Sequence, residues 1–207
     1  MFGKKNKEFK QLLKKAKKGD ADAQYKVACK YYDGTDIERD YESAVFWLKK
    51  SAGQGNSDSQ NFLGCCYETG NGVEKNVETA FVWYNKSAEQ KNPVAICNIA
   101  RCYKYGICVE QDKVKAFELF EKAALQNYPK ALNECGVCYK TGTGVQKSLE
   151  KSAEYFLKAA GLGEANAQYN LATAYAYGEG IAKDLKKAIE WFIKSAENGC
   201  ASAQSKL

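Results

Sequence analysis

The sequence predicts an all-α solenoid of helix-turn-helix repeats, because three residue types recur with one fixed period of 36 residues. The repeating glycines are Gly34, Gly70, Gly106, Gly142 and Gly178. A tyrosine lies three residues before each of these glycines, and isoleucine or valine lies three residues after it. Repeats of this length stack on their neighbours, so we expect function to lie on an exposed surface.

Composition is that of an ordinary folded protein and favours helices throughout. The 207 residues fit one elongated domain, and 45% hydrophobic against 27% charged residues argues against disorder. Only two prolines interrupt the chain. No apolar run resembles a signal peptide or the roughly 20 residues of a membrane span, which predicts a cytoplasmic protein.

Residues 1–20 are predicted to form a basic N-terminal capping helix. Their register is that of a second repeat helix, since Leu12 aligns with Leu48 and Ala16 with Ala52. Residues 1–18 hold eight lysines and one glutamate, which is +7, so the remaining chain carries −1 of the total +6. A solenoid that follows nucleic acid would spread its bases along the array, so we predict no nucleic-acid partner.

Five repeats follow over residues 21–200, each with a first helix (A) and a second helix (B). They span 21–56, 57–92, 93–128, 129–164 and 165–200. In the fifth repeat, Leu171 and Tyr175 lie on one apolar stripe and Gly178 marks the end of helix A. Asp184 is the predicted N-cap of helix B, whose buried face carries Trp191.

The repeats preserve residue size at equivalent positions. Aromatic residues of helix B recur opposite glycine or alanine of helix A, which predicts interlocking hairpins. Pro93 and Pro129 are one period apart, at the first position of an A helix, where proline costs no hydrogen bond. Asp36 and Cys108 replace a second loop glycine. Cysteine tolerates positive φ poorly, which predicts a different shape for the third loop.

Residues 201–207 are predicted to form a truncated C-terminal helix, the opening of a sixth A helix. Leu207 falls in the core column of Leu63 and Leu171. We expect this tail to cover Trp191 and the rest of the fifth B helix incompletely. The resulting expectation is a monomer with an adhesive end or a weak symmetric dimer through the fifth repeat.

These columns resemble the Sel-1-like repeat family, a branch of the tetratricopeptide-like superfamily. The residues that carry the resemblance in the fifth repeat include Ala167-Gln168, Leu171, Tyr175, Gly178, Gly180, Asp184, Ala188, Trp191 and Lys194. The resemblance covers nearly the whole chain. It implies right-handed superhelical stacking and a role as a scaffold or adaptor for protein or peptide partners, without naming the partner.

By this resemblance, A helices line the concave side of the solenoid. The candidate partner-binding residues lie on A helices outside the core stripe: Tyr25, Asn61, Arg101, Asn133 and Tyr169. Two tyrosines, two asparagines and an arginine suit peptide recognition. For each residue the alternative is an ordinary solvated position.

No catalytic residue, cofactor or metal ligand is predicted, and we expect a protein that is not an enzyme. The nine cysteines lack the disulfide positions of the secreted branch of the family, and Cys135-x-x-Cys138 has no second ligand pair and no histidine to complete a metal site. We expect free thiols that fill the core.

Two alternative functions stay open. Some relatives are linked to penicillin binding and β-lactam hydrolysis, and Ser148-x-x-Lys151 and Lys140-Thr141-Gly142 occur here. Their order is reversed and no Ser-Asp-Asn is present, so chance is favoured. The second alternative is an adaptor held at an acidic membrane surface by the basic N-terminal helix, although that helix has an apolar face suited to packing on the first repeat.

Overall fold

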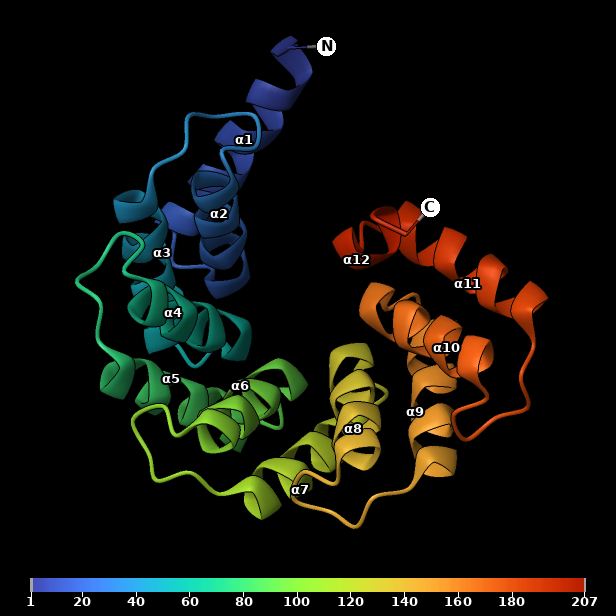
Figure 1. Cartoon of the computed structure of the whole chain (residues 1–207). Helices are drawn as coiled ribbons and strands as arrows, with labels where there is room; N and C mark the ends of the chain where they lie inside the picture. Colours follow the sequence, from blue (N-terminus) through green and yellow to red (C-terminus); the bar gives the residue numbers. More distant parts are fainter. Residues whose placement is uncertain (1, 207) are drawn as a thin grey trace. The chain divides into compact units, whose positions relative to one another are not determined.

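The predicted all-α fold class is confirmed by a computed structural model that describes residues 2–206, with side chains from residue 8 onward, and contains no strand in that range. The helices, shown in Figure 1, are α1 (Phe2–Lys17), α2 (Ala21–Asp33), α3 (Tyr41–Gly53), α4 (Ser57–Thr69), α5 (Val77–Glu89), α6 (Pro93–Tyr105), α7 (Lys113–Ala124), α8 (Pro129–Thr141), α9 (Leu149–Gly161), α10 (Ala165–Tyr177), α11 (Leu185–Glu197) and α12 (Ala201–Gln204). They form two compact units, Met1–Ala95 and Ile96–Leu207, which are described separately below.

Helices begin where side chains satisfy the first free backbone N–H groups. The carboxylate of Asp184 accepts a hydrogen bond from the Lys187 amide at 3.0 Å, which confirms the predicted N-cap of α11. Asn56 caps α4 in the same way. The two prolines begin α6 and α8, as the sequence predicts.

Each A helix ends in a residue with left-handed backbone. Gly142 has φ 74° and donates its N–H to the Cys138 carbonyl at 2.8 Å, which closes the last turn of α8. The loop then folds back toward α8, and the Ser148 amide donates to the Tyr139 carbonyl at 3.0 Å. The same bond recurs between equivalent residues of the other four repeats, so one backbone bond fixes the start of every B helix.

A second left-handed residue follows two positions later and lies against the preceding repeat. A Cβ atom added to Gly144 would overlap the Lys113 carbonyl oxygen, and one added to Gly180 would overlap that of Leu149. The different shape expected for the third loop is wrong. Cys108 takes φ 53°, and the loop closes with the usual bond, from Asp112 N–H to the Tyr103 carbonyl. A single left-handed non-glycine residue costs only about 1–2 kcal/mol, so one cysteine at this position does not prevent the loop from closing as in the other repeats.

Aromatic B-helix residues fit against small A-helix residues, as predicted. The Tyr84 ring is fully buried, and a Cβ added to Gly64 would lie 2.6 Å from its Cε1 atom. Phe156 occupies the same place against Gly136. Burying each such ring stabilises the fold by about 1.5–3 kcal/mol.

Three polar side chains of the first repeat, the buried Gln24 and Ser51 and the exposed Gln54, make hydrogen bonds that sequence analysis did not single out. Gln24 donates to the Ala16 carbonyl at 3.0 Å, Gln54 donates to the Gln24 side-chain oxygen at 2.8 Å, and Ser51 donates to the Ala21 carbonyl at 2.7 Å. Two other repeats hold the equivalent sets Gln60, Ser87, Gln90 and Gln168, Ser195, Asn198. At the positions of Gln24 and Ser51, the third repeat instead buries Ile96 and Ala123, and the fourth repeat buries Leu132 and Ala159.

The two ends of the array are covered unequally. At the start, α1 packs on α2 and buries Phe9 and Ala16. Five lysines of residues 1–20 are exposed: Lys10, Lys14, Lys15, Lys17 and Lys18. The side chains of Lys4, Lys5 and Lys7 lie outside the described ones.

At the C-terminal end, α12 is only four residues long, and Ala203 is its buried residue. Ile189 of α11 is 57% exposed, whereas Val45 and Phe117 at equivalent positions are 3% and 8% exposed. The fifth B helix is therefore incompletely covered, as expected. Leu207, assigned to the core column by its sequence register, lies outside the described residues.

Three glycine-to-alanine variants separate backbone strain from steric overlap. Gly144→Ala combines φ 71° with overlap of the Lys113 carbonyl and should destabilise the fold by about 3 kcal/mol. Gly142→Ala has φ 74° but meets Lys147 Cβ at an ordinary 3.5 Å, so about 1 kcal/mol is expected. Gly161→Ala meets nothing within 4 Å and should leave stability unchanged or slightly raised. Urea unfolding followed by circular dichroism measures all three, and equal midpoints for Gly142→Ala and Gly144→Ala would contradict the close approach.

Removing residues 201–207 should lower the melting temperature, because Ala203 is fully buried against the fifth repeat. A loss of about 2–4 °C is expected for each kcal/mol of lost packing. Ala203→Asp in the full chain should reproduce the loss, whereas Ser202→Asp, at an exposed neighbour, should not. Unchanged melting of the shortened chain, measured by circular dichroism, would show that α12 does not act as a cap.

Candidate functional site

The five predicted binding residues all lie on A helices. Tyr25 lies on α2 and Asn61 on α4, both in the first unit, whereas Arg101 (α6), Asn133 (α8) and Tyr169 (α10) belong to the second. We call the exposed and half-buried residues of α2, α4, α6, α8 and α10 the A-helix face. Within each unit, this face is described from its own side chains.

In the first unit, Tyr25 is half-buried and its hydroxyl forms a hydrogen bond with the Cys29 thiol. Burial raises the pKa of Tyr25, and the nearby thiol and the carboxylates of Asp58 and Asp33 raise it further. Tyr25 therefore stays neutral at physiological pH and keeps its hydroxyl proton. Asn61 is also half-buried, one repeat further along.

In the second unit, the structure pairs Asn133 with a residue that sequence analysis did not select. Asn133 is only 7% exposed, and its Oδ1 accepts a hydrogen bond from Asn170 Nδ2 at 2.9 Å. Tyr169 packs edge-on against Phe192, with ring centroids 5.5 Å apart, and the Lys206 ammonium lies 5.2 Å from the Tyr169 centroid. Asn133 and Tyr169 therefore present only part of their surface to solvent.

Cys97 holds the position in the third repeat that Tyr25, Asn61, Asn133 and Tyr169 hold in theirs. Arg101, the predicted member, lies one helical turn further along α6. The 36-residue register alone would have found Cys97, but cysteine was assigned to the core by residue type. Burial raises the pKa of its thiol to about 12, so Cys97 is protonated at physiological pH.

Charged side chains from α6 and α8 surround Cys97. Glu134 raises the pKa of the Cys97 thiol, whereas Lys130, Arg101 and Lys104 lower it. Lys104 Nζ donates to Glu134 Oε2 at 2.7 Å and joins the two helices. Burial disfavours the charged form of Lys104, but the hydrogen bond and charge of Glu134 outweigh burial and raise the pKa of Lys104, so Lys104 stays protonated.

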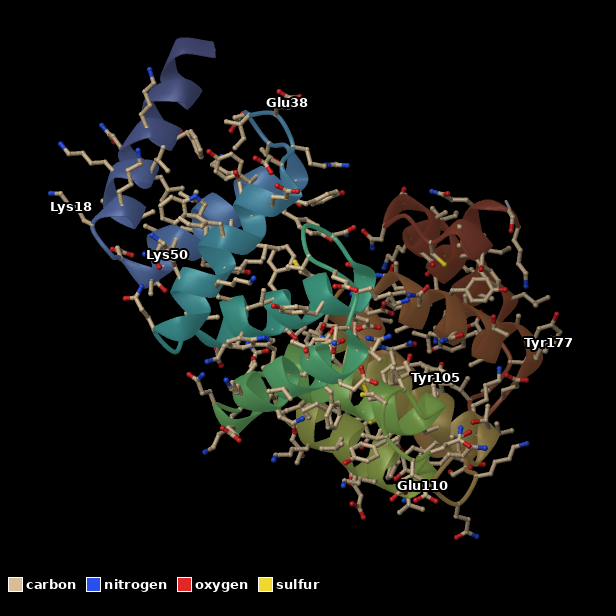
Figure 2. All side chains as sticks on the ribbon, turned by 90° about the vertical axis from the view of Figure 1, so that its left-hand side faces the viewer. Lys18, Glu38, Lys50, Tyr105, Glu110 and Tyr177 are labelled. Atoms are coloured by element: carbon tan, nitrogen blue, oxygen red, sulfur yellow. The ribbon has the colours of Figure 1, made fainter. Side chains whose placement is uncertain are left out.

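Two exposed tyrosines lie on the last turn of A helices in the second unit, and both are labelled in Figure 2. Tyr105 of α6 is 60% exposed and Tyr177 of α10 is 70% exposed. The Lys104 ammonium lies 5.3 Å from the Tyr105 ring centroid. Exposed tyrosines next to amides and cations are typical of surfaces that bind proteins.

No disulfide joins any two of the nine cysteines, which all lie within residues 2–206, and five of them are buried and four half-buried. Burial raises the pKa of Cys66 to about 12 and of Cys138 to about 11. The described residues contain no group of three histidines, cysteines or acids that could hold a metal ion. Among helices in the described part of the chain, none has the length and hydropathy of a membrane span.

The two motifs considered for β-lactam chemistry have structural roles at helix ends. Ser148 is the N-cap of α9: its Oγ accepts the Lys151 backbone N–H at 3.2 Å and lies 3.1 Å from a Glu150 carboxylate oxygen. The spacing Ser-x-x-Lys is therefore that of a capping bond. Lys140-Thr141-Gly142 is the end of α8, where Lys140 pairs with Glu179 at 2.7 Å.

Comparison with known structures gives several close matches in fold. A Sel1 repeat protein from Oxalobacter formigenes is 31% identical, with a TM-score of 0.85 over 91% of this chain and 77% of that one. The c5321 protective antigen of uropathogenic Escherichia coli is 29% identical, with a TM-score of 0.72 over 96% of this chain and half of that one. Immunity protein Pa5087 from Pseudomonas aeruginosa is 27% identical, with a TM-score of 0.68 over 88% and 67%.

Comparison with curated proteins found no match. The family model for the Sel1 repeat matches five successive segments, 21–56, 57–92, 93–128, 129–164 and 165–200. These segments cover more than half of the chain, and each contains one A helix and one B helix. The chain belongs to the Sel1 repeat family.

Proposed function

We propose that this chain is a protein-interaction scaffold that binds a peptide or protein partner through its A-helix face. The observation that carries the proposal is the contrast between columns of the repeat. Core columns keep residue size from repeat to repeat, whereas the column of Tyr25, Asn61, Cys97, Asn133 and Tyr169 changes its chemistry. Packing requires size, so variation beside a preserved core marks a surface suited to recognition.

The chemistry of this face supports a protein partner. It combines tyrosines, carboxamides and an arginine, which are residues that bind main chains and side chains of other proteins. Close packing of the A and B helices also supports a protein partner, because it holds the exposed side chains in place before the partner binds. Family membership supports the scaffold role without identifying the partner.

The triple variant Asn61→Ala, Arg101→Ala, Asn133→Ala should lose most partner capture in affinity purification followed by mass spectrometry. Loss of central contacts typically costs about 1–2 kcal/mol each, so capture should fall at least tenfold. The matched control Glu89→Ala, Lys122→Ala, Glu154→Ala changes exposed residues of three B helices and should retain capture.

Because Asn133 is mostly buried, Arg101→Ala alone serves as a milder second variant, and circular dichroism verifies folding of each protein. If a partner still binds both A-helix variants but no longer binds the B-helix control, the binding surface lies on the B helices.

The oligomeric state is part of the same proposal: a weak symmetric dimer forms through α11. Leu185, Ile189 and Ile193 lie at i, i+4 and i+8 and form an exposed apolar stripe on this helix. In the first and third repeats the residue equivalent to Ile189 is buried, so this stripe resembles an internal packing surface rather than an ordinary exterior.

Light scattering across a concentration series should show a mass that rises with concentration. Ile189→Lys should abolish the rise, because a charge would enter the stripe, whereas Val82→Lys, at an equally exposed residue of α5, should not. A constant monomer mass in the unmodified protein would exclude the dimer.

A further inference from the structure

The A helices of the two units differ in charge. In the first unit, the bases on α2 and α4 are Lys26 and Lys30 and the acids are Asp22, Asp33, Asp58 and Glu68, which is 2 − 4 = −2. In the second unit, the bases on α6, α8 and α10 are Arg101, Lys104, Lys130 and Lys140 and the acid is Glu134, which is 4 − 1 = +3. The B helices of that unit mix eight bases with six acids, so the near absence of acids is specific to its A helices.

From this asymmetry we propose that the A-helix face of the second unit binds an acidic, extended segment of a partner protein. This inference rests on the proposed scaffold function and adds the chemistry of the partner. Complementary charge steers such a segment to the surface and selects against basic segments.

Cations of α6 and α8 lie on adjoining helices, because the Lys104–Glu134 ion pair joins the two. Lys130, Arg101 and Lys104 each lower the pKa of the Cys97 thiol, which indicates a positive potential around this part of the face. Glu134 is bonded to Lys104 at 2.7 Å, which orients that ammonium group. Lys130 is exposed at the start of α8 and adds a positive charge beyond this ion pair.

Hydrogen-bonding groups beside the cations suit an extended main chain. Asn170 is half-buried, and its side-chain oxygen lies outside the bond that its amide group donates to Asn133. A carboxamide oxygen can accept a peptide N–H, and the buried Asn133 holds the Asn170 side chain in place through that bond. Tyr105 and Tyr177 add exposed aromatic rings on the same A helices.

A peptide fits these features better than a nucleic acid does. Affinity for nucleic acid comes mostly from the phosphates that lysines and arginines neutralise, and this face carries four cations, of which Lys104 and Lys140 are in ion pairs with glutamates. Carboxamides that match a peptide main chain favour a protein segment. The proposed ligand is therefore a run rich in glutamate or aspartate that adopts an extended conformation.

Fluorescence anisotropy with a short fluorescein-labelled peptide of alternating glutamate and alanine tests the proposal on the full chain. Binding is expected at low salt, with weakening as salt rises. Lys130→Glu should raise Kd about fivefold, because it reverses one exposed charge next to the ligand. Lys122→Glu makes the same change at an exposed residue of the B helix α7 and should leave Kd unchanged.

A lysine–alanine peptide and a single-stranded oligonucleotide of equal length complete the experiment. No binding of the acidic peptide, equal weakening by Lys130→Glu and Lys122→Glu, or tighter binding of either competing probe would overturn the proposal. The scaffold function would survive such a result if partner capture still depended on the triple A-helix variant, so the two failures are distinguishable.

Discussion

Each A helix ends in a left-handed residue, and the stacking of the repeats depends on this backbone reversal. Gly142 closes α8 and turns the chain so that the Ser148 amide reaches the Tyr139 carbonyl. Two residues after the reversal, Gly144 brings the loop against the carbonyl of Lys113 in the preceding repeat. The reversal therefore fixes both the hairpin and its distance from its neighbour, which in turn sets Phe156 against Gly136.

Features set by local chemistry were predictable from sequence. The glycine period, the proline starts and the Asp184 N-cap depend on a few consecutive residues, so each leaves a readable pattern. The third loop was not predictable in this way. Cysteine alone disfavours positive φ, but Cys108 takes φ 53°, and the loop closes with the same Asp112–Tyr103 backbone bond as the other repeats.

The candidate site was predictable only in part, because its contacts cross between repeats. The register places Tyr25, Asn61, Asn133 and Tyr169 at one position of the repeat, and the same register includes Cys97. The Asn133–Asn170 bond joins residues 37 apart, and a single column of the repeat does not contain both. The charge difference between the A helices of the two units also emerges only once the helix bounds are known.

The glutamine-containing polar sets have a consequence for how such a chain can evolve. Within the first repeat, Gln54 bonds to Gln24 and Ser51 bonds to the Ala21 carbonyl, and the bond from Gln24 to the preceding helix ends on the main-chain carbonyl of Ala16. Any amino acid supplies that acceptor. The glutamine of a polar set therefore needs no matching side chain in the preceding repeat, although the Ser51 hydroxyl also accepts a hydrogen bond from Ser59 of the next repeat at 2.7 Å. Duplication or loss of a whole repeat by recombination would preserve the bonds that end on main-chain carbonyls, and only contacts such as the Ser59–Ser51 bond would depend on which repeat follows.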